Sequence, residues 1–211
     1  MLDLILQSLA LKDEQRNGWL LRRVSRPESV ADHCWGTALL CLLFAEKAGV
    51  NACRAVSMAI VHDLAEAVTG DVPTRVAAMD DPEVIEAKRR RERDGMKALL
   101  SDAGAHPESQ VRELWEEYEE NETETAHFVR DMNLIDMCAQ AHRYEESGRY
   151  DPSAPNENFP DFAGLDEFFA TTRPRLTGAV GRELFDELRE RYAAIPSVRE
   201  RGGPRLEPSE K

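Results

Sequence analysis

Apolar side chains recur at helical spacing along almost the whole chain, and this periodicity limits the fold more than any other feature. The expected helices cover residues 2–11, 30–47, 52–64, 82–101, 108–119, 124–144, 165–171 and 182–193. No segment shows the alternating pattern of a strand, and no internal repeat is visible. The 211 residues are enough for one domain with a sizeable core. We therefore predict an all-α fold, with one helical domain over residues 1–194 and a polar, disordered tail over residues 195–211.

The ends of several expected helices carry recognisable signals. Ser29 followed by Asp32 resembles a capping box at the start of the second helix, and Gly49 stops that helix. Asn51 then caps the third helix. Glycine and proline interrupt the helical pattern soon afterwards, which predicts a loop over residues 69–74.

The net charge of −13 argues against partners that are themselves anionic, such as nucleic acids and acidic membrane surfaces. The basic run Arg89-Arg90-Arg91 is flanked by acids and by Lys88, which is typical of a solvated helix face. No apolar run approaches the roughly 20 residues of a membrane span, and the first residues lack the basic leader of an exported protein. The cysteines lie in expected helices without CxxC spacing, which indicates buried thiols in a cytoplasmic protein; they are Cys34, Cys41, Cys53 and Cys138.

Ionisable side chains gather around His62-Asp63, at the end of the apolar run 59–66. Glu66 follows His62 by four residues, so a continuous helix would place both on one face. Asp63 would lie about 100° further round that helix, and His33 would meet the group from the preceding helix. A single histidine on an apolar helix is more often a core residue, but burying this many ionisable groups without a metal would be costly. Imidazole with carboxylate favours a divalent transition metal over Ca or Mg.

These segments resemble the HD-domain metal-dependent phosphohydrolases, and among them the bacterial 5′-deoxynucleotidases and their HD-domain-containing-protein-2 relatives. The resemblance covers roughly residues 5–147. The segments that carry it are Gly18-Trp19, Pro27-Glu28-Ser29-Val30-Ala31-Asp32-His33, His62-Asp63-Leu64-Ala65-Glu66, Gly70-Asp71-Val72-Pro73-Thr74, Leu114-Trp115-Glu116-Glu117-Tyr118-Glu119, Gln140-Ala141 and Tyr144-Glu145.

The resemblance implies a helical HD-domain fold, a homodimer, and release of phosphate from (deoxy)ribonucleoside 5′-monophosphates with one divalent transition metal such as Mn, Co, Ni, Fe or Zn. The metal ligands that it implies are His33, His62, Asp63 and a later residue in the position of Asn133. The catalytic residues that it implies are Glu66 and Asp71, and the substrate-binding residues are Arg16, Trp19, Asp71 and Thr74. The Arg-x-Gly-Trp order is closer to the HD-domain-containing-protein-2 branch, because the strict deoxynucleotidase pattern has arginine where this chain has Gly18.

Asn133 is a departure from the family, which has its last metal-binding aspartate at this position. Asp131 lies about 200° away on the expected helix, so it cannot take over the role, and Asp136 lies about 60° away and one turn further on. Three interpretations remain open. Asn133 coordinates through its carbonyl oxygen, the metal uses three protein ligands and water, or the site is damaged.

Two alternative functions from other classes compete with the hydrolase. The chain could be a catalytically weak or inactive nucleotide-binding protein on an HD fold if Asn133 prevents metal binding. It could instead be an HD-fold oxygenase with two irons, which needs further histidine and carboxylate ligands. The remaining histidines lie outside the two motifs and argue against the oxygenase; they are His106, His127 and His142.

Overall fold

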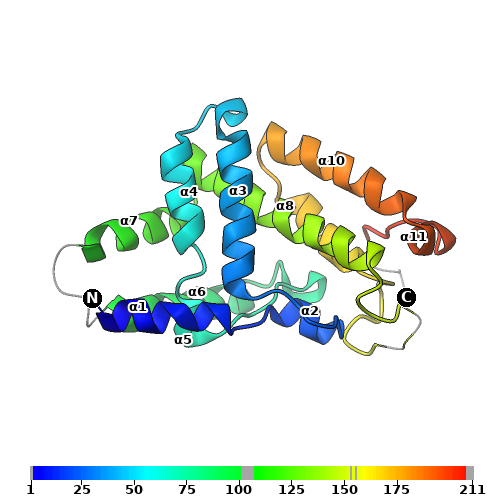
Figure 1. Cartoon of the computed structure of the whole chain (residues 1–211), viewed down its shortest axis with the longest axis horizontal. Coiled ribbons are helices and arrows are strands. Elements are labelled where there is room, and N and C mark those ends of the chain that lie inside the picture. Colours follow the sequence, from blue (N-terminus) through cyan, green and yellow to red (C-terminus); the bar gives the residue numbers. More distant parts are fainter. Residues whose placement is uncertain (1, 101–106, 153, 155, 208–211) are drawn as a thin grey trace.

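The structure is a computed structural model that describes residues 2–100, 107–152, 154 and 156–207. Within these ranges the regular elements are all helices, so the predicted all-α fold is confirmed (Figure 1). They are α1 Leu2–Ser8, η1 Leu9–Lys12, α2 Asn17–Leu21, α3 Val30–Ala48, α4 Ala52–Val61, α5 Glu66–Thr69, η2 Val76–Ala78, α6 Pro82–Leu100, α7 Pro107–Glu120, α8 Glu124–Glu146, α9 Asp166–Thr172, η3 Arg173–Arg175, α10 Ala179–Ala194 and α11 Pro196–Glu200. Ser101, the expected end of one helix, and residues 208–211 of the expected tail lie outside the described residues.

The expected cap signals are present. The Ser29 hydroxyl accepts a hydrogen bond from the Asp32 backbone N–H at 3.1 Å, and the Asp32 carboxylate accepts one from the Ser29 backbone at 2.9 Å. Gly49 ends α3 with a φ of 73°, a left-handed conformation that glycine adopts without strain. Asn51 caps α4 by accepting a hydrogen bond from the backbone N–H of Arg54.

Besides shifts of a few residues at other helix ends, the structure differs from the prediction at the end of α4 and in the segment before α3. The helix expected to run through Leu64 ends at Val61, and α5 starts separately at Glu66. No glycine or proline marks this break, so the apolar periodicity alone could not reveal it. Secondly, α2 forms inside the segment expected to be irregular, residues 12–28.

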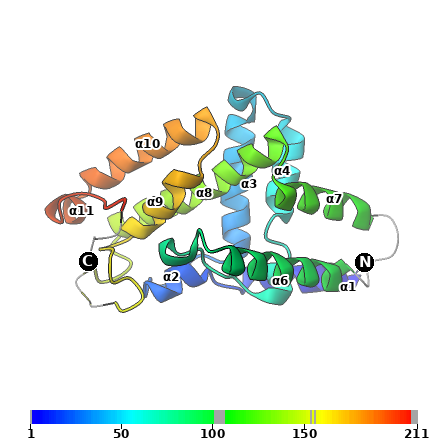
Figure 2. The ribbon, with the colours of Figure 1, turned by 180° about the vertical axis from the view of Figure 1, so that it is seen from behind.

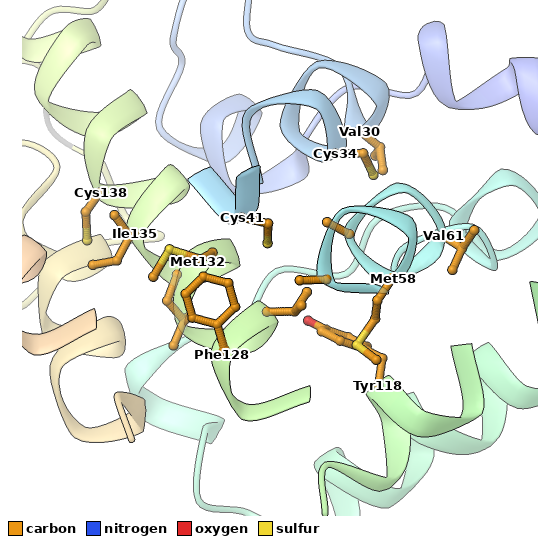
Figure 3. Packing of buried hydrophobic residues seen from close by; sticks show 14 of the residues in the cluster. Val30, Cys34, Cys41, Met58, Val61, Tyr118, Phe128, Met132, Ile135 and Cys138 are labelled. Carbon is orange, nitrogen blue, oxygen red and sulfur yellow. The ribbon is translucent and has the colours of Figure 1, made fainter. Parts of the chain in front are cut away.

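The core lies where α3, α4 and α8 pack against one another, with α10 covering α8 and part of α3 (Figure 1). Figure 3 shows buried side chains converging from α3, α4, α7 and α8, with Cys41 between the side chains of α4 and α8. Fully burying one large apolar side chain, such as Met, Ile or Phe, stabilises a fold by roughly 1.5–3 kcal/mol. This packing fixes the ends of α3 and α4 and the middle of α8, which carry the candidate site.

The remaining helices surround this core. Figure 2 shows α6 running along one edge of the molecule, where it contacts α5, α1 and α7. None of the described helices is long and apolar enough to cross a membrane. Cys34, Cys41 and Cys138 are buried as expected, but Cys53 is exposed because it lies on the outer face of α4.

The expectation of a disordered tail from residue 195 is wrong for its first part, because Pro196–Glu200 forms α11. Val198 is fully buried. Arg201 forms ion pairs with Glu145 of α8 at 2.9 Å and with Asp166 of α9 at 3.3 Å. The apolar and charged contacts together hold α11 on the domain.

Candidate metal and phosphate site

His33 and His62 are brought together from different helices. His33 lies in the first turn of α3, and His62 is the residue that follows the last turn of α4. Their ring centroids are 5.4 Å apart, and both side chains are fully buried. The Nε2 atoms of both rings have no hydrogen-bond partner among the described residues.

Asp63 completes the group from the turn after α4. Its Oδ2 atom lies 3.2 Å from Nε2 of His62 and 3.8 Å from Nε2 of His33. The ligand atoms of these three residues lie within 4.8 Å of one another. Because α4 ends at Val61, Asp63 is presented by a turn and not by the continuous helix that we expected.

The environment of the two rings favours a cation between them. Nδ1 of His62 lies 2.8 Å from the Ala59 carbonyl, which can only accept, so Nδ1 carries a proton and Nε2 is the nitrogen that faces the Asp63 carboxylate, where it can bind a proton or a metal cation. Burial lowers the pKa of His33 to about 3, with a further contribution from the charge of Arg16, so His33 is neutral near pH 7. Burial opposes protonation of His62 too, but the Asp63 carboxylate raises the pKa of His62 well above its ordinary value. Two imidazoles and one carboxylate around unpartnered atoms fit a divalent transition metal.

Asp136 of α8 holds the other nitrogen of His33. The distance from its Oδ2 to Nδ1 of His33 is 2.7 Å. This contact depends on Gly36, one turn after His33, because a Cβ at that position would lie 2.0 Å from the Asp136 carboxylate. Carboxylates in this position orient metal-binding histidines and fix their tautomer. Burial raises the pKa of Asp136 to about 7.

Arg16 and Asp71 form a second charged group beside the histidines. Arg16 Nη1 lies 3.3 Å from Oδ2 of Asp63 and 3.2 Å from Oδ1 of Asp71. Asp71 also accepts a hydrogen bond from the backbone N–H of Asn17 at 2.6 Å, which ties the loop after α5 to the start of α2. Burial opposes the charge of Arg16, but the carboxylates of Asp71 and Asp63 raise its pKa above the ordinary value.

Glu66 is buried in the first turn of α5, and its Oε2 atom has no hydrogen-bond partner among the described residues. Burial and the negative charges of Asp63 and Asp71 raise the pKa of Glu66 well above its ordinary value. A raised pKa favours the protonated carboxyl group, which can act as a proton donor.

Asn133 lies on α8 and lines the same cavity as His62 and Asp63. Its Nδ2 atom donates a hydrogen bond to the Tyr118 hydroxyl at 2.8 Å. Asp131 faces the opposite way, as the sequence predicts, and accepts hydrogen bonds from the backbone N–H groups of Thr177 and Gly178. With its amide nitrogen on Tyr118, Asn133 has a carbonyl oxygen that makes no hydrogen bond to the described residues and can bind another partner.

A cavity of about 450 Å³ opens over this group. Trp19 lines it but is only 1% exposed, because its ring stacks on Phe168 at 4.1 Å and its N–H donates to Glu28. Thr74 lines the opening and is exposed. The structure therefore brings the predicted residues of the site to one cavity or its floor, with Trp19 largely covered by its neighbours.

Sequence reasoning missed several residues of this cavity. Lys88 reaches it from α6 and pairs with Glu92 at 3.3 Å, and Arg175 reaches it from η3. The sequence also did not predict that Asp136 would hold His33. Its position three residues after Asn133 was the available signal, since residues three apart are neighbours on a helix surface.

Known proteins resemble this chain over most of its length. The HD domain family matches residues 9–164. The 5′-deoxynucleotidase HDDC2 of Bos taurus is 35% identical over 178 residues, which are 80% of this chain and 84% of that protein. The 5′-deoxynucleotidase HDDC2 of Homo sapiens is 36% identical over 163 residues, which are 74% of this chain and 77% of that protein.

Solved structures show the same fold. A conserved hypothetical protein from Pyrococcus furiosus has a TM-score of 0.66 and 33% identity, covering 90% of this chain and 99% of its own. A predicted metal-dependent phosphohydrolase from Magnetospirillum magnetotacticum has a TM-score of 0.61 and 25% identity, covering 92% of this chain and 94% of its own. The matched range 9–164 contains His33, His62 and Asp63, the resemblance seen in the sequence is confirmed, and this chain belongs to the HD domain family.

Proposed function

We propose that this protein is a phosphoric monoester hydrolase that releases phosphate from deoxyribonucleoside and ribonucleoside 5′-monophosphates, with one divalent transition metal. The observation that carries the proposal is the pair of unpartnered Nε2 atoms of His33 and His62 facing the Asp63 carboxylate. The relatives named as 5′-deoxynucleotidases support the class of substrate.

His33, His62 and Asp63 would hold the metal, with the carbonyl oxygen of Asn133 as a neutral fourth ligand. When bound there, the metal would lower the pKa of a water molecule and polarise a phosphoryl oxygen. Mn, Co, Ni, Fe and Zn all suit two imidazoles and a carboxylate.

Glu66 would supply the proton that the departing 5′-oxygen needs. Its buried Oε2 atom has no other partner among the described residues, and burial together with the negative charges of Asp63 and Asp71 raises its pKa, which favours the protonated form. Arg16 would neutralise the phosphate, and Asp71 would position Arg16 through their 3.2 Å contact. Asp71 would thereby contribute to both catalysis and substrate binding.

The sugar and base would lie in the upper part of the cavity. Thr74 offers a hydroxyl at the opening, while the edge of Trp19 closes the wall between Gly18 and Phe168. An apolar wall without a polar partner would disfavour the extra hydroxyl of a ribonucleotide to a modest degree. Selection for the deoxy sugar would then be a preference and not a strict exclusion.

A phosphate-release assay with deoxyribonucleoside and ribonucleoside monophosphates, each with Mn, Co, Ni, Mg and Zn, tests the proposal. The metal content of every sample should be measured beside its activity. The Glu66→Gln variant should retain the metal and lose turnover, whereas His62→Ala should lose both. Wild-type activity in Glu66→Gln would contradict the role of this residue, and an absence of release from all substrates would contradict the proposed function.

The sequence also left open a nucleotide-binding protein with weak or no catalysis, because Asn133 stands where the family has an aspartate, but the relatives named as 5′-deoxynucleotidases do not support this alternative. A protein of that kind would bind a nucleoside monophosphate without hydrolysing it. Equilibrium binding measured beside phosphate release separates the two functions.

We also propose that two copies of this chain associate through an apolar face on α3 and its neighbours, in a cytoplasmic protein. The exposed side chains of the central turns of α3 are apolar, and α1 adds further ones; those of α3 are Trp35, Leu39, Leu42 and Leu43. Trp35 is 69% exposed and Leu42 is 62% exposed, which is unusual for side chains of this size. Figure 1 shows α1 and α3 on the same side of the molecule.

A further inference from the structure

Among the described residues, five cationic side chains line the cavity, and four of them have a partner or are exposed to solvent. Arg16 pairs with Asp63 and Asp71, and Lys88 pairs with Glu92. Arg130 donates to the Tyr118 carbonyl and contacts Glu119, while Arg89 is exposed. The fifth cation is Arg175.

Arg175 is half-buried and has no carboxylate partner among the described residues. Its Nε atom donates a hydrogen bond to the Thr171 carbonyl at 2.7 Å, which fixes the side chain against the last turn of α9. Its two terminal nitrogens form no hydrogen bond with an acceptor in the described part of the chain, so the outer edge of the guanidinium keeps its donors free.

The electrostatic surroundings of Arg175 are unfavourable to its charge. Burial lowers the pKa of Arg175 below its ordinary value, and the positive charges of Arg130 and Arg16 lower it further. Arg16 shows the opposite shift, because neighbouring carboxylates compensate its burial. Burying a charge is costly unless it is paired, so this position favours an anion that enters from the cavity.

We propose that Arg175 binds the phosphate group of the substrate from within the same cavity as Arg16. This proposal rests on the proposed function, since the phosphate is the anion that a nucleoside monophosphate brings into the cavity. A guanidinium with two free terminal nitrogens matches two phosphate oxygens in a forked arrangement. Arg175 lies beyond residues 9–164, so the match to the HD domain family does not assign it a role.

The experiment compares Arg175→Gln with Arg175→Lys and with Arg173→Gln in metal-loaded protein. Arg173 is the matched control, because it lies in the same turn, carries the same charge and is exposed. The probes are inorganic phosphate and a deoxyribonucleoside that lacks phosphate, each measured by equilibrium binding. Metal content and thermal unfolding of each variant are recorded in parallel.

Arg175→Gln should weaken phosphate binding about tenfold or more, the scale of a lost hydrogen bond to a charged group. Arg175→Lys should retain part of the affinity, Arg173→Gln should bind as the parent does, and nucleoside binding should stay unchanged. Where turnover is measurable, the KM of Arg175→Gln should rise with little change in kcat.

Unchanged phosphate affinity in Arg175→Gln would overturn the proposal, and so would a loss confined to nucleoside binding, which would place Arg175 on the base. Equal losses of phosphate affinity in Arg175→Gln and Arg173→Gln would also overturn it, because the effect would then come from the net positive charge and not from a contact of Arg175. Because phosphate binding is measured without turnover, the outcome is distinct from a failure of the proposed hydrolysis.

Discussion

Nδ1 of His33 lies 2.7 Å from a carboxylate oxygen of Asp136, one hundred and three residues further along the chain. Nε2 of the same ring faces Asp63, so His33 is held on one side and left open on the other. A ring fixed in this way has its lone pair directed before any metal arrives, which lowers the entropy cost of binding.

Replacing Asp136 by Asn should therefore weaken metal binding while the fold is retained. We expect a loss of about 10- to 100-fold in affinity for Mn or Co, the usual effect of removing such a carboxylate. Titration calorimetry of the metal-free protein measures it directly. Glu146→Gln, an exposed change of the same charge on the same helix, is the control. Equal affinities in both variants would show that Asp136 does not orient His33.

Gly36→Ala should destabilise the protein by about 1–3 kcal/mol, the cost of overpacking, because the new Cβ would lie 2.0 Å from the Asp136 carboxylate. The loss should be largely recovered in the double variant Gly36→Ala with Asp136→Ala. Denaturant unfolding of the two single variants and the double variant closes a thermodynamic cycle. Additive losses would mean that the two positions do not interact.

Asn133→Asp should tighten metal binding by about tenfold or more, since a carboxylate is a stronger ligand than a neutral amide. The hydrogen bond to the Tyr118 hydroxyl can form again, with the carboxylate accepting in place of the amide donating. Tyr118→Phe in the parent chain is the control for this contact. If the aspartate variant binds metal no better than the parent, residue 133 is not a ligand.

Glu145→Gln should lower stability at neutral pH and lose this effect in acid. Burial alone would raise the pKa of Glu145, but hydrogen bonds from Arg201, Ser197 and Tyr150 hold it below its ordinary value. The stabilisation is therefore present above the unfolded-state pKa of 4.5 and is lost as the pH falls through the lower folded-state value. Unfolding between pH 3 and 8 should show a difference of about 1–3 kcal/mol near pH 7 that shrinks in acid. A difference that is constant with pH would exclude this origin.

Leu42→Glu should convert a dimer into a monomer, because it places a charge in the exposed apolar face of α3. Light scattering over a range of concentrations measures the mass in solution. Val84→Glu is the control, since Val84 is 47% exposed on α6, away from α3. A parent protein that is monomeric at all concentrations would contradict the dimer itself.

The starts of α3 and α4 could be predicted from the sequence. Ser29 with Asp32 and Asn51 mark helix starts by chemistry that acts within three residues, and both starts lie where they were predicted. The end of α4 at Val61 did not follow, because the run to Leu64 keeps its apolar spacing and the break serves the site by turning Asp63 toward the histidines. The periodicity of apolar residues does not reveal in which direction the Asp63 side chain has to point.

The candidate site was predictable to the extent that its residues belong to recognisable motifs. His33 and His62 with Asp63 were identified from the family pattern and do meet. The role of Asp136 depends on the close approach of α3 to α8, and that of Arg175 depends on where the chain returns after α9, so neither is written in local spacing.

The space left by Gly36 gives a criterion for comparing related chains. A larger residue at this position and a carboxylate at position 136 cannot both keep their present places, since the Cβ of one would overlap the oxygen of the other. Across relatives, the two positions should therefore vary together: wherever a side chain appears at 36, the acid at 136 should be shortened or replaced. Such paired variation would mark the branches of the family in which the support of His33 has been rebuilt.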